Sequence, residues 1–206
     1  MKLRIASWSL LVLILAAVPA VAQTVYNNGS INGNVNGWTI NFGFIVSDSF
    51  NVTNNSTTIT GGSFGIWLFP GDTLTSAELS ITSGENGGTS YFDQTVNFTQ
   101  GACSMNQFGY NVCTDSTVFN GPTLNTGTFW LNLQNGSVPS GDPVFWDMNS
   151  GPSSASANNI GTIFSESFTL LGSESSTAPS VPEPSSLMLF ASGVLGLAGL
   201  LRRRLF

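Results

Sequence analysis

The sequence predicts an all-β fold, specifically an antiparallel β-sandwich of jelly-roll type, and three observations support this. Between residues 23 and 171 the chain is rich in Phe, Trp, Ile, Val and Thr, whereas disordered chains are poor in such residues. Several short segments there alternate apolar and polar residues, with glycine-rich turns between them. No segment between the two ends of the chain shows a convincing helical period.

Alternation identifies the clearest strands. In residues 77–82 every second residue is apolar, as expected when one face of a sheet packs and the other is solvated. Residues 128–133 repeat the pattern, with Phe129 and Leu131 on the inner face and Trp130 on the outer face. Further strands are expected at residues 38–44, 47–53, 90–99 and 114–119.

Two more strands and three turns complete the expected domain. Residues 64–69 are apolar on both faces, which predicts a central strand. Residues 163–170 are expected to form the closing strand, with Phe164, Phe168 and Leu170 inward. Turns are expected at Pro70–Asp72, Gly84–Gly88 and Asn135–Gly136.

The N-terminus has the organisation of a secretory signal peptide. Lys2 and Arg4 precede an apolar stretch that ends near Val18, and Ala20 and Ala22 form a small-x-small cleavage pattern. We therefore predict a signal peptide over residues 1–22, a mature chain beginning at Gln23, and passage through the Sec machinery and signal peptidase. A first membrane helix is the alternative, and the short apolar core disfavours it.

The C-terminus combines a proline motif, an apolar run and a basic cluster. Val181, Pro182, Glu183 and Pro184 precede the run from Ser185 to Leu201, which would reach about 25 Å as a helix and so span a thin bilayer. Arg202, Arg203 and Arg204 follow it, and such clusters stay on the cytoplasmic side. We predict a membrane helix over residues 185–201, after a flexible linker over residues 172–180.

This order of parts resembles the PEP-CTERM sorting signal, in which Val-Pro-Glu-Pro precedes a glycine-containing helix and a basic end. The resemblance covers residues 181–206 and implies recognition by an exosortase, transient anchoring in the inner membrane of a Gram-negative bacterium that makes exopolysaccharide, and release to the envelope or extracellular matrix. The alternative is an ordinary C-terminal anchor with a proline-containing stalk, which has no need for Pro-Glu-Pro at this spacing.

The distribution of charge excludes several functions. All 5 Lys and Arg residues lie in the two terminal segments, and the chain has no His. Without cations to hold phosphate, the domain is not expected to bind nucleic acid or nucleotides. Imidazole-dependent catalytic triads and imidazole-ligated metals are excluded as well.

Cys103 and Cys113 are the only cysteines, and export takes them to an oxidising compartment. We expect a disulfide between them, closing a loop that contains the reversal Phe108–Asn111. Two free thiols or a metal site are the alternatives, and the metal site would lack further nitrogen or sulfur ligands.

Carboxylates are the only strong acid–base groups left in the domain. Asp142, Asp147 and Glu166 are the candidates for glycoside hydrolysis, which needs two carboxyls facing a cleft. Asp48, Asp142 and Asp147 are the weak candidates for a structural calcium, although the chain has no contiguous calcium loop. The alternative for all of them is that they cap turns and face solvent, so no catalytic residue, metal or other cofactor is assigned.

Aromatic residues beside turns suggest sugar binding, because β-sandwiches stack exposed rings on sugar faces. Trp130 is the first candidate for a glycan contact, and Trp146 and Tyr110 are the others; the alternative is that loops cover them. Residues 67–72 and 145–155 also resemble, more loosely, a β-sandwich found with PEP-CTERM tails, which implies a fold and no established activity.

These observations predict an exported, non-enzymatic protein whose single β-sandwich domain, residues 23–171, has a structural or adhesive role. The opposed hypothesis is a carbohydrate-binding module acting on exopolysaccharide, and a glycoside hydrolase is the third.

Overall fold

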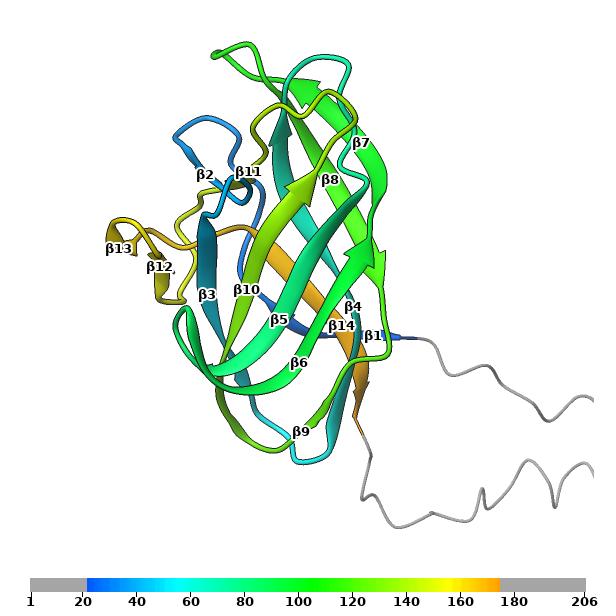
Figure 1. Ribbon diagram of the computed structural model, residues 1–206. Coiled ribbons are helices and arrows are strands. Elements are labelled where there is room, and N and C mark those ends of the chain that lie inside the picture. Colours follow the sequence, from blue (N-terminus) through cyan, green and yellow to red (C-terminus); the bar gives the residue numbers. More distant parts are fainter. Residues whose placement is uncertain (1–21, 175–206) are drawn as a thin grey trace, which may run out of the picture. The chain divides into compact units, whose positions relative to one another are not determined.

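The computed structural model describes residues 22–174, and every regular element in that range is a β-strand (Figure 1). Within the same range no helix has the length and apolarity needed to cross a membrane. The predicted signal peptide, except its last residue Ala22, and the predicted membrane helix and basic tail fall on residues outside the described range.

The strands form two antiparallel sheets, which confirms the prediction of an all-β antiparallel fold. The eight-stranded sheet has the order β1-β14-β4-β11-β2, with β8 and β9 also pairing with β4, and β7 pairing with β8. Its strands are β1 (Gln23–Asn27), β2 (Gly37–Thr39), β4 (Thr57–Leu68), β7 (Thr99–Met105), β8 (Asn111–Val118), β9 (Thr123–Leu124), β11 (Phe145–Asp147) and β14 (Phe168–Glu174).

The six-stranded sheet has the order β13-β12-β3-β10-β5-β6. Its strands are β3 (Ile45–Val52), β5 (Ser76–Gly84), β6 (Gly87–Asn97), β10 (Gly127–Ser137), β12 (Ala155–Ala157) and β13 (Gly161–Ile163). Neighbours such as β3, β10 and β5 are not consecutive in sequence, so the chain passes repeatedly between the two sheets.

One hydrophobic core lies between the inner faces of the sheets. In Figure 1, β10, β5 and β6 lie in front of β4, β14 and β1. The predicted alternation is confirmed in β10, where Leu131 and Leu133 are buried in the core and Trp130 lies on the other face. The core residues Ile66 of β4, Leu79 of β5 and Leu170 of β14 complete the contact between the sheets.

Strand β4 is the central strand that the apolar segment 64–69 predicted. It pairs with β14, β8, β9 and β11, so both of its edges are occupied along much of its length. It contains glycines where neighbours approach closely: a Cβ on Gly61 would lie 2.6 Å from the Thr117 carbonyl oxygen, and one on Gly65 would lie 2.2 Å from Ser167 Oγ. A side chain at either position would require the neighbouring backbone or side chain to move.

The structure corrects four expectations. Phe164 is 72% exposed rather than inward, because β13 ends at Ile163 and β14 begins only at Phe168. Asn135–Gly136 is not a hairpin turn; β10 continues to Ser137, with an irregularity in its pairing with β5 and Asn135 at φ 52°. The strand expected at residues 38–44 is limited to β2. Gly172–Glu174 belong to β14 rather than to a linker, because they pair with Thr57–Ile59 of β4.

Candidate functional site

Tyr110 and four other aromatic side chains gather on the outer face of the eight-stranded sheet. We call Trp67, Phe69, Phe108, Tyr110 and Phe145 the aromatic patch. The ring centroid of Tyr110 lies 5.0 Å from that of Phe69, 5.5 Å from Phe145 and 5.8 Å from Trp67. Phe108 stacks on Trp67 at 5.9 Å and is 52% exposed, so the aromatic patch reaches solvent at Phe108.

A disulfide-closed hairpin positions this patch. Strands β7 and β8 pair antiparallel, and Cys103 and Cys113 are bonded across them with their Cα atoms 4.0 Å apart. This confirms the predicted disulfide. The reversal between the strands carries Phe108, and Gln107 Nε2 donates to the Asn34 carbonyl oxygen at 3.0 Å. The disulfide therefore links the two strands of the hairpin, and a hydrogen bond connects the hairpin to the segment that precedes β2.

Asp147 fixes the buried side of the patch. Its carboxylate accepts hydrogen bonds from Trp67 Nε1 at 2.6 Å, from the Asn32 N–H at 2.7 Å and from the Gly33 N–H at 2.7 Å. Asp147 is buried at the end of β11, next to β4. Both oxygens of Asp147 thus hold the Trp67 indole and the backbone turn at Asn32 and Gly33, so this acid has structural hydrogen-bond partners.

A cleft of about 390 Å³ lies between the disulfide-closed hairpin and the segment around Asn32. Apart from the bonded Cys103, its walls carry only apolar and neutral polar residues: Ile31, Asn32, Gly33, Asn34, Ala102, Ser104, Met105, Asn106, Val112 and Thr114. The cleft offers hydrogen-bonding groups and no acid or base.

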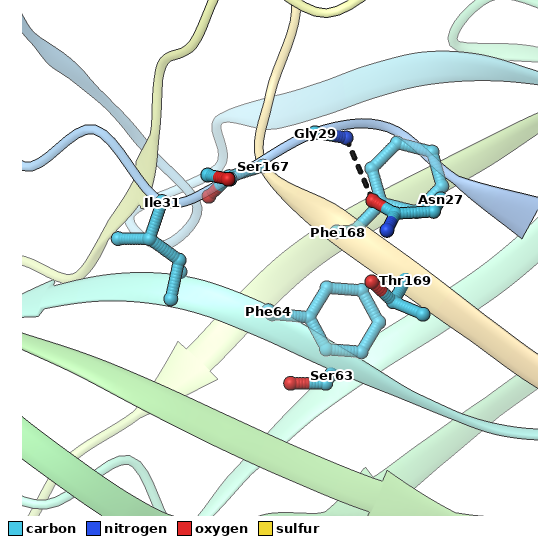
Figure 2. A pocket seen from close by; sticks show the side chains of 10 residues that line it. Asn27, Gly29, Ile31, Ser63, Phe64, Ser167, Phe168 and Thr169 are labelled. Atoms are coloured by element: carbon cyan, nitrogen blue, oxygen red, sulfur yellow. Dashed lines mark hydrogen bonds between the residues drawn. The ribbon is translucent and has the colours of Figure 1, made fainter. Parts of the chain in front are cut away.

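A smaller pocket of about 250 Å³ lies nearby, over β4 and β14 (Figure 2). Figure 2 shows Phe64, Ser63 and Thr169 along one side and Asn27, which accepts a hydrogen bond from the Gly29 N–H at 2.8 Å, along the other. Ser167 also lines this pocket, but its neighbour Glu166 does not. No carboxyl contributes to the wall.

A pair of buried carboxyls, Asp48 and Glu166, lies where β3 meets the segment before β14. Asp48 Oδ2 accepts hydrogen bonds from the Glu166 N–H at 2.6 Å, from Asn28 Nδ2 at 3.0 Å and from Ser165 Oγ at 3.2 Å. Asp48 Oδ1 and both carboxyl oxygens of Glu166 are buried and have no hydrogen-bond partner in the described structure. We call Asp48 and Glu166 the carboxyl pair.

The carboxyl pair occupies an electrostatically unfavourable environment. Burial raises the pKa of Asp48 to about 7, although its hydrogen bonds act in the opposite direction. Burial, together with the negative charges of Asp48 and Asp147, raises the pKa of Glu166 well above its usual range. No Lys, Arg or His occurs between residues 22 and 174, so the domain has no basic side chain to compensate these acids.

The structure separates the predicted candidates. The prediction that Trp146 contacts a glycan is wrong, because its side chain is 0% exposed in the core and its Nε1 donates to the Ser167 carbonyl oxygen at 2.9 Å. Tyr110 lies in the aromatic patch. Trp130 lies on the outer face of the other sheet, partly buried between Ser49 and Thr82, so the structure does not bring it together with Tyr110.

The predicted acids are likewise divided. Asp48 and Asp147 are both buried close to Glu166, whereas Asp142 lies in the loop before β11, where its backbone contacts Asn41 and Ser140. Among residues 22–174, no three His, Cys, Asp or Glu side chains are arranged to hold a metal ion. Neither Asp147 nor Glu166 faces a cleft, since both are 0% exposed, and this corrects their expected place in a glycosidase-like groove.

The sequence grouped Glu166 with Asp142 and Asp147 as candidates for glycoside hydrolysis and did not predict its proximity to Asp48. A signal was present, because the alternation that placed Phe168 and Leu170 inward also places Glu166 inward. The predicted residues Ala22 and Gln23 lie at the start of the described range, and β1 begins at Gln23. The predicted residues Ala20, Val181, Pro182, Glu183, Pro184, Arg202, Arg203 and Arg204 lie outside it.

The chain thus joins an antiparallel all-β domain, poor in reactive side chains, to a short C-terminal segment of distinct composition. Residues 180–204 of that segment match the family model described as the PEP-CTERM protein-sorting motif. The chain carries this sorting motif, as the sequence predicted, and the motif indicates an exported protein processed by an exosortase. No curated protein and no solved structure matches the chain.

Proposed function

We propose that the protein is a structural or adhesive component of the cell envelope or the exopolysaccharide matrix. The sorting motif at residues 180–204 carries this proposal, because it directs the preceding domain to an exosortase. The proposed route comprises Sec export, removal of residues 1–22, and transient anchoring in the inner membrane by residues 185–201 with Arg202–Arg204 on the cytoplasmic side. Exosortase processing then releases the domain.

The composition of the domain supports a non-enzymatic role. The cleft beside the disulfide-closed hairpin and the pocket over β4 and β14 carry no ionisable acid or base in their walls. The acids that were candidates for glycoside hydrolysis are buried, except Asp142, and hydrolysis needs two carboxyls that reach the same sugar. The proposal includes a jelly-roll-like arrangement of the two sheets, which presents a stable polar surface to the matrix.

Cell fractionation tests this role. The chain is produced in an exopolysaccharide-forming bacterium with its exosortase gene intact and in the same strain with that gene deleted. We expect the domain in the envelope or matrix fraction of the first strain and in the inner-membrane fraction of the second. Recovery in the inner membrane of both strains would contradict the proposal.

The aromatic patch favours a second candidate function, which is carbohydrate binding to the exopolysaccharide. Phe108 exposes a ring on the reversal of the disulfide-closed hairpin, whose strands line a cleft with amide and hydroxyl groups. Sugars are bound by this combination of a flat apolar surface and hydrogen-bonding side chains. The disulfide-closed hairpin limits the movement of Phe108, which reduces the entropic cost of binding.

A glycan array distinguishes the two functions. Carbohydrate binding predicts a signal for the wild-type protein that falls at least about tenfold in Phe108→Ala, which corresponds to the loss of roughly 1.4 kcal/mol. Trp130→Ala tests the other predicted platform. Phe164→Ala is the control, because Phe164 is 72% exposed, more than Phe108, but lies near β13, outside the aromatic patch. Absence of binding to any glycan, including the native polymer, favours the structural role.

A further inference from the structure

The described residues contain no positively charged side chain that could compensate the carboxyl pair. Asp48 and Glu166 are each 0% exposed, and there is no basic residue between residues 22 and 174. Burying an isolated carboxylate is costly, so buried acids are found neutralised by a proton, paired with a cation, or coordinated to a metal. A basic partner is excluded here by composition.

The unpaired oxygens belong to both members of the carboxyl pair. Asp48 Oδ2 is saturated by three donors, which leaves Oδ1 as its free atom. Both oxygens of Glu166 are also buried without a partner, and the negative charge of Asp48 repels that of Glu166 more strongly than Asp147 does. Three carboxyl oxygens of two electrostatically coupled acids are therefore buried without donors.

Neutral oxygen groups lie beside Asp48. Asn28 and Ser165 are buried beside Asp48, Ser153 Oγ contacts Ser165 Oγ, and Tyr26 Oη donates to Asn28 Oδ1 at 3.0 Å. Calcium takes six to eight oxygen ligands from carboxylates, carbonyls and side-chain oxygens, whereas zinc and copper prefer nitrogen and sulfur. Asp147 is not available as a third carboxylate, because its oxygens accept from Trp67, Asn32 and Gly33.

We propose that Asp48 and Glu166 bind one calcium ion between the two sheets, with neutral oxygens completing its coordination. One divalent cation compensates two carboxylates, so the bound site is neutral overall. The site would lock β3 of one sheet to the segment leading into β14 of the other. Extracellular modules bind calcium with a Kd of about 0.1–1 mM, a concentration that an exported protein meets.

Metal content and thermal stability test this site in the full-length chain, purified in mild detergent and either stripped with EDTA or dialysed against 1 mM CaCl2. We expect about one calcium per chain after dialysis. We also expect Tm to rise by about 5 °C in 10 mM CaCl2, because a ligand that binds only the folded state stabilises it. The same concentration of MgCl2 should give a smaller rise, since magnesium demands a stricter geometry.

Glu166→Gln and Asp48→Asn should lose both the bound calcium and the rise in Tm. In EDTA, Glu166→Gln should melt no lower than the wild type, because it removes a buried charge and keeps the side-chain shape. Asp142→Asn is the matched control and should retain the full response, because it removes one acid from a loop outside the pair.

Two results would overturn the proposal. If the wild-type protein holds no calcium and its Tm does not respond, protons rather than a metal neutralise the carboxyl pair. If Glu166→Gln and Asp48→Asn bind calcium as the wild type does, the ion lies on surface acids elsewhere. Asp48→Asn decides the question should Glu166→Gln fail to fold. None of these outcomes depends on sorting or on the matrix role.

Discussion

Single buried acids define the unusual chemistry of this domain. Asp48, Asp115, Asp147 and Glu166 are all 0% exposed in a part of the chain without basic residues. Their environments nevertheless differ, because Asp147 accepts three hydrogen bonds whereas both carboxyl oxygens of Asp115 have no partner in the described structure. The same residue type is therefore stabilising at one position and costly at another.

Asp147→Asn should destabilise the domain by about 2–4 kcal/mol. The amide can accept with only one atom, so its NH2 group would face at least one of the donors from Trp67, Asn32 and Gly33. Urea unfolding of the two proteins at pH 7 measures the difference. Asp142→Asn serves as the control and should change the free energy of unfolding by less than about 0.5 kcal/mol.

Asp115 should make stability fall as pH rises. Burial raises its pKa from 3.8 to about 7, so between pH 4 and pH 7 the unfolded chain loses this proton while the folded chain retains it. The contribution of protonated Asp115 to the free energy of unfolding is therefore complete below pH 4. This contribution, up to about 4 kcal/mol, is lost as pH rises towards 7. Urea unfolding of the wild type and Asp115→Asn at several pH values should give curves that diverge over this interval. Parallel curves would show that Asp115 titrates normally.

Close contacts to strand glycines control the packing of β4. Gly65→Ala should destabilise strongly, by about 3 kcal/mol or more, because the new Cβ would lie 2.2 Å from Ser167 Oγ and 2.9 Å from Asp147 Cβ. Gly84→Ala is the matched control: it lies at the end of β5, where the nearest atom would be 3.7 Å away. Equal effects on the thermal midpoint in the two variants would contradict this account of β4.

The disulfide should stabilise the hairpin of β7 and β8. On the chain-entropy model, closing a loop with a sequence separation of 10 contributes about 2–3 kcal/mol. The double variant Cys103→Ser/Cys113→Ser should lose that amount in urea unfolding and should then be insensitive to dithiothreitol, whereas the wild type becomes less stable on reduction. A wild type that dithiothreitol leaves unchanged at full reduction would refute the contribution.

At the scale of elements, alternation in the sequence predicted strands better than it predicted their ends. The faces of β10 and the burial of β4 followed from local patterns, because one-sided and two-sided burial leave different periodicities. The prediction that Phe164 points inward was wrong, because Phe164 lies in the connection between β13 and β14 and not in a strand. Asn135–Gly136 has the composition of a hairpin turn, but Gln134 and Ser137 on either side of it both pair with β5, so it forms an irregularity within β10.

The candidate sites depend on contacts that no local pattern contains. Asp48 and Glu166 are separated by 118 residues, and the aromatic patch combines β4, the hairpin reversal and β11. Periodicity shows which face a residue occupies, but the partner across the core follows from the order of strands in the sheets. The burial of Trp146 was missed for the same reason, since its short segment follows the turn-forming residues Gly141–Pro143.

At the scale of the whole molecule, two parts of the chain serve separate purposes. The sorting motif matched at residues 180–204 determines the destination, and the described strands supply a domain with a single core. All positive charge lies outside the domain, in the terminal segments that we propose are removed or transient. The delivered material is then an acidic β domain without imidazole, guanidinium or ammonium side chains.

The most direct test of this account is the mass of the exported chain. The wild type and a variant with Pro182, Glu183 and Pro184 replaced by alanine are produced in a host that encodes an exosortase, and intact masses are measured by mass spectrometry. We predict that the wild type lacks the segment following the motif, including Arg202–Arg204, while the variant retains it. A variant that matures to the same shorter form, or a wild type that keeps its arginines permanently, would contradict the account.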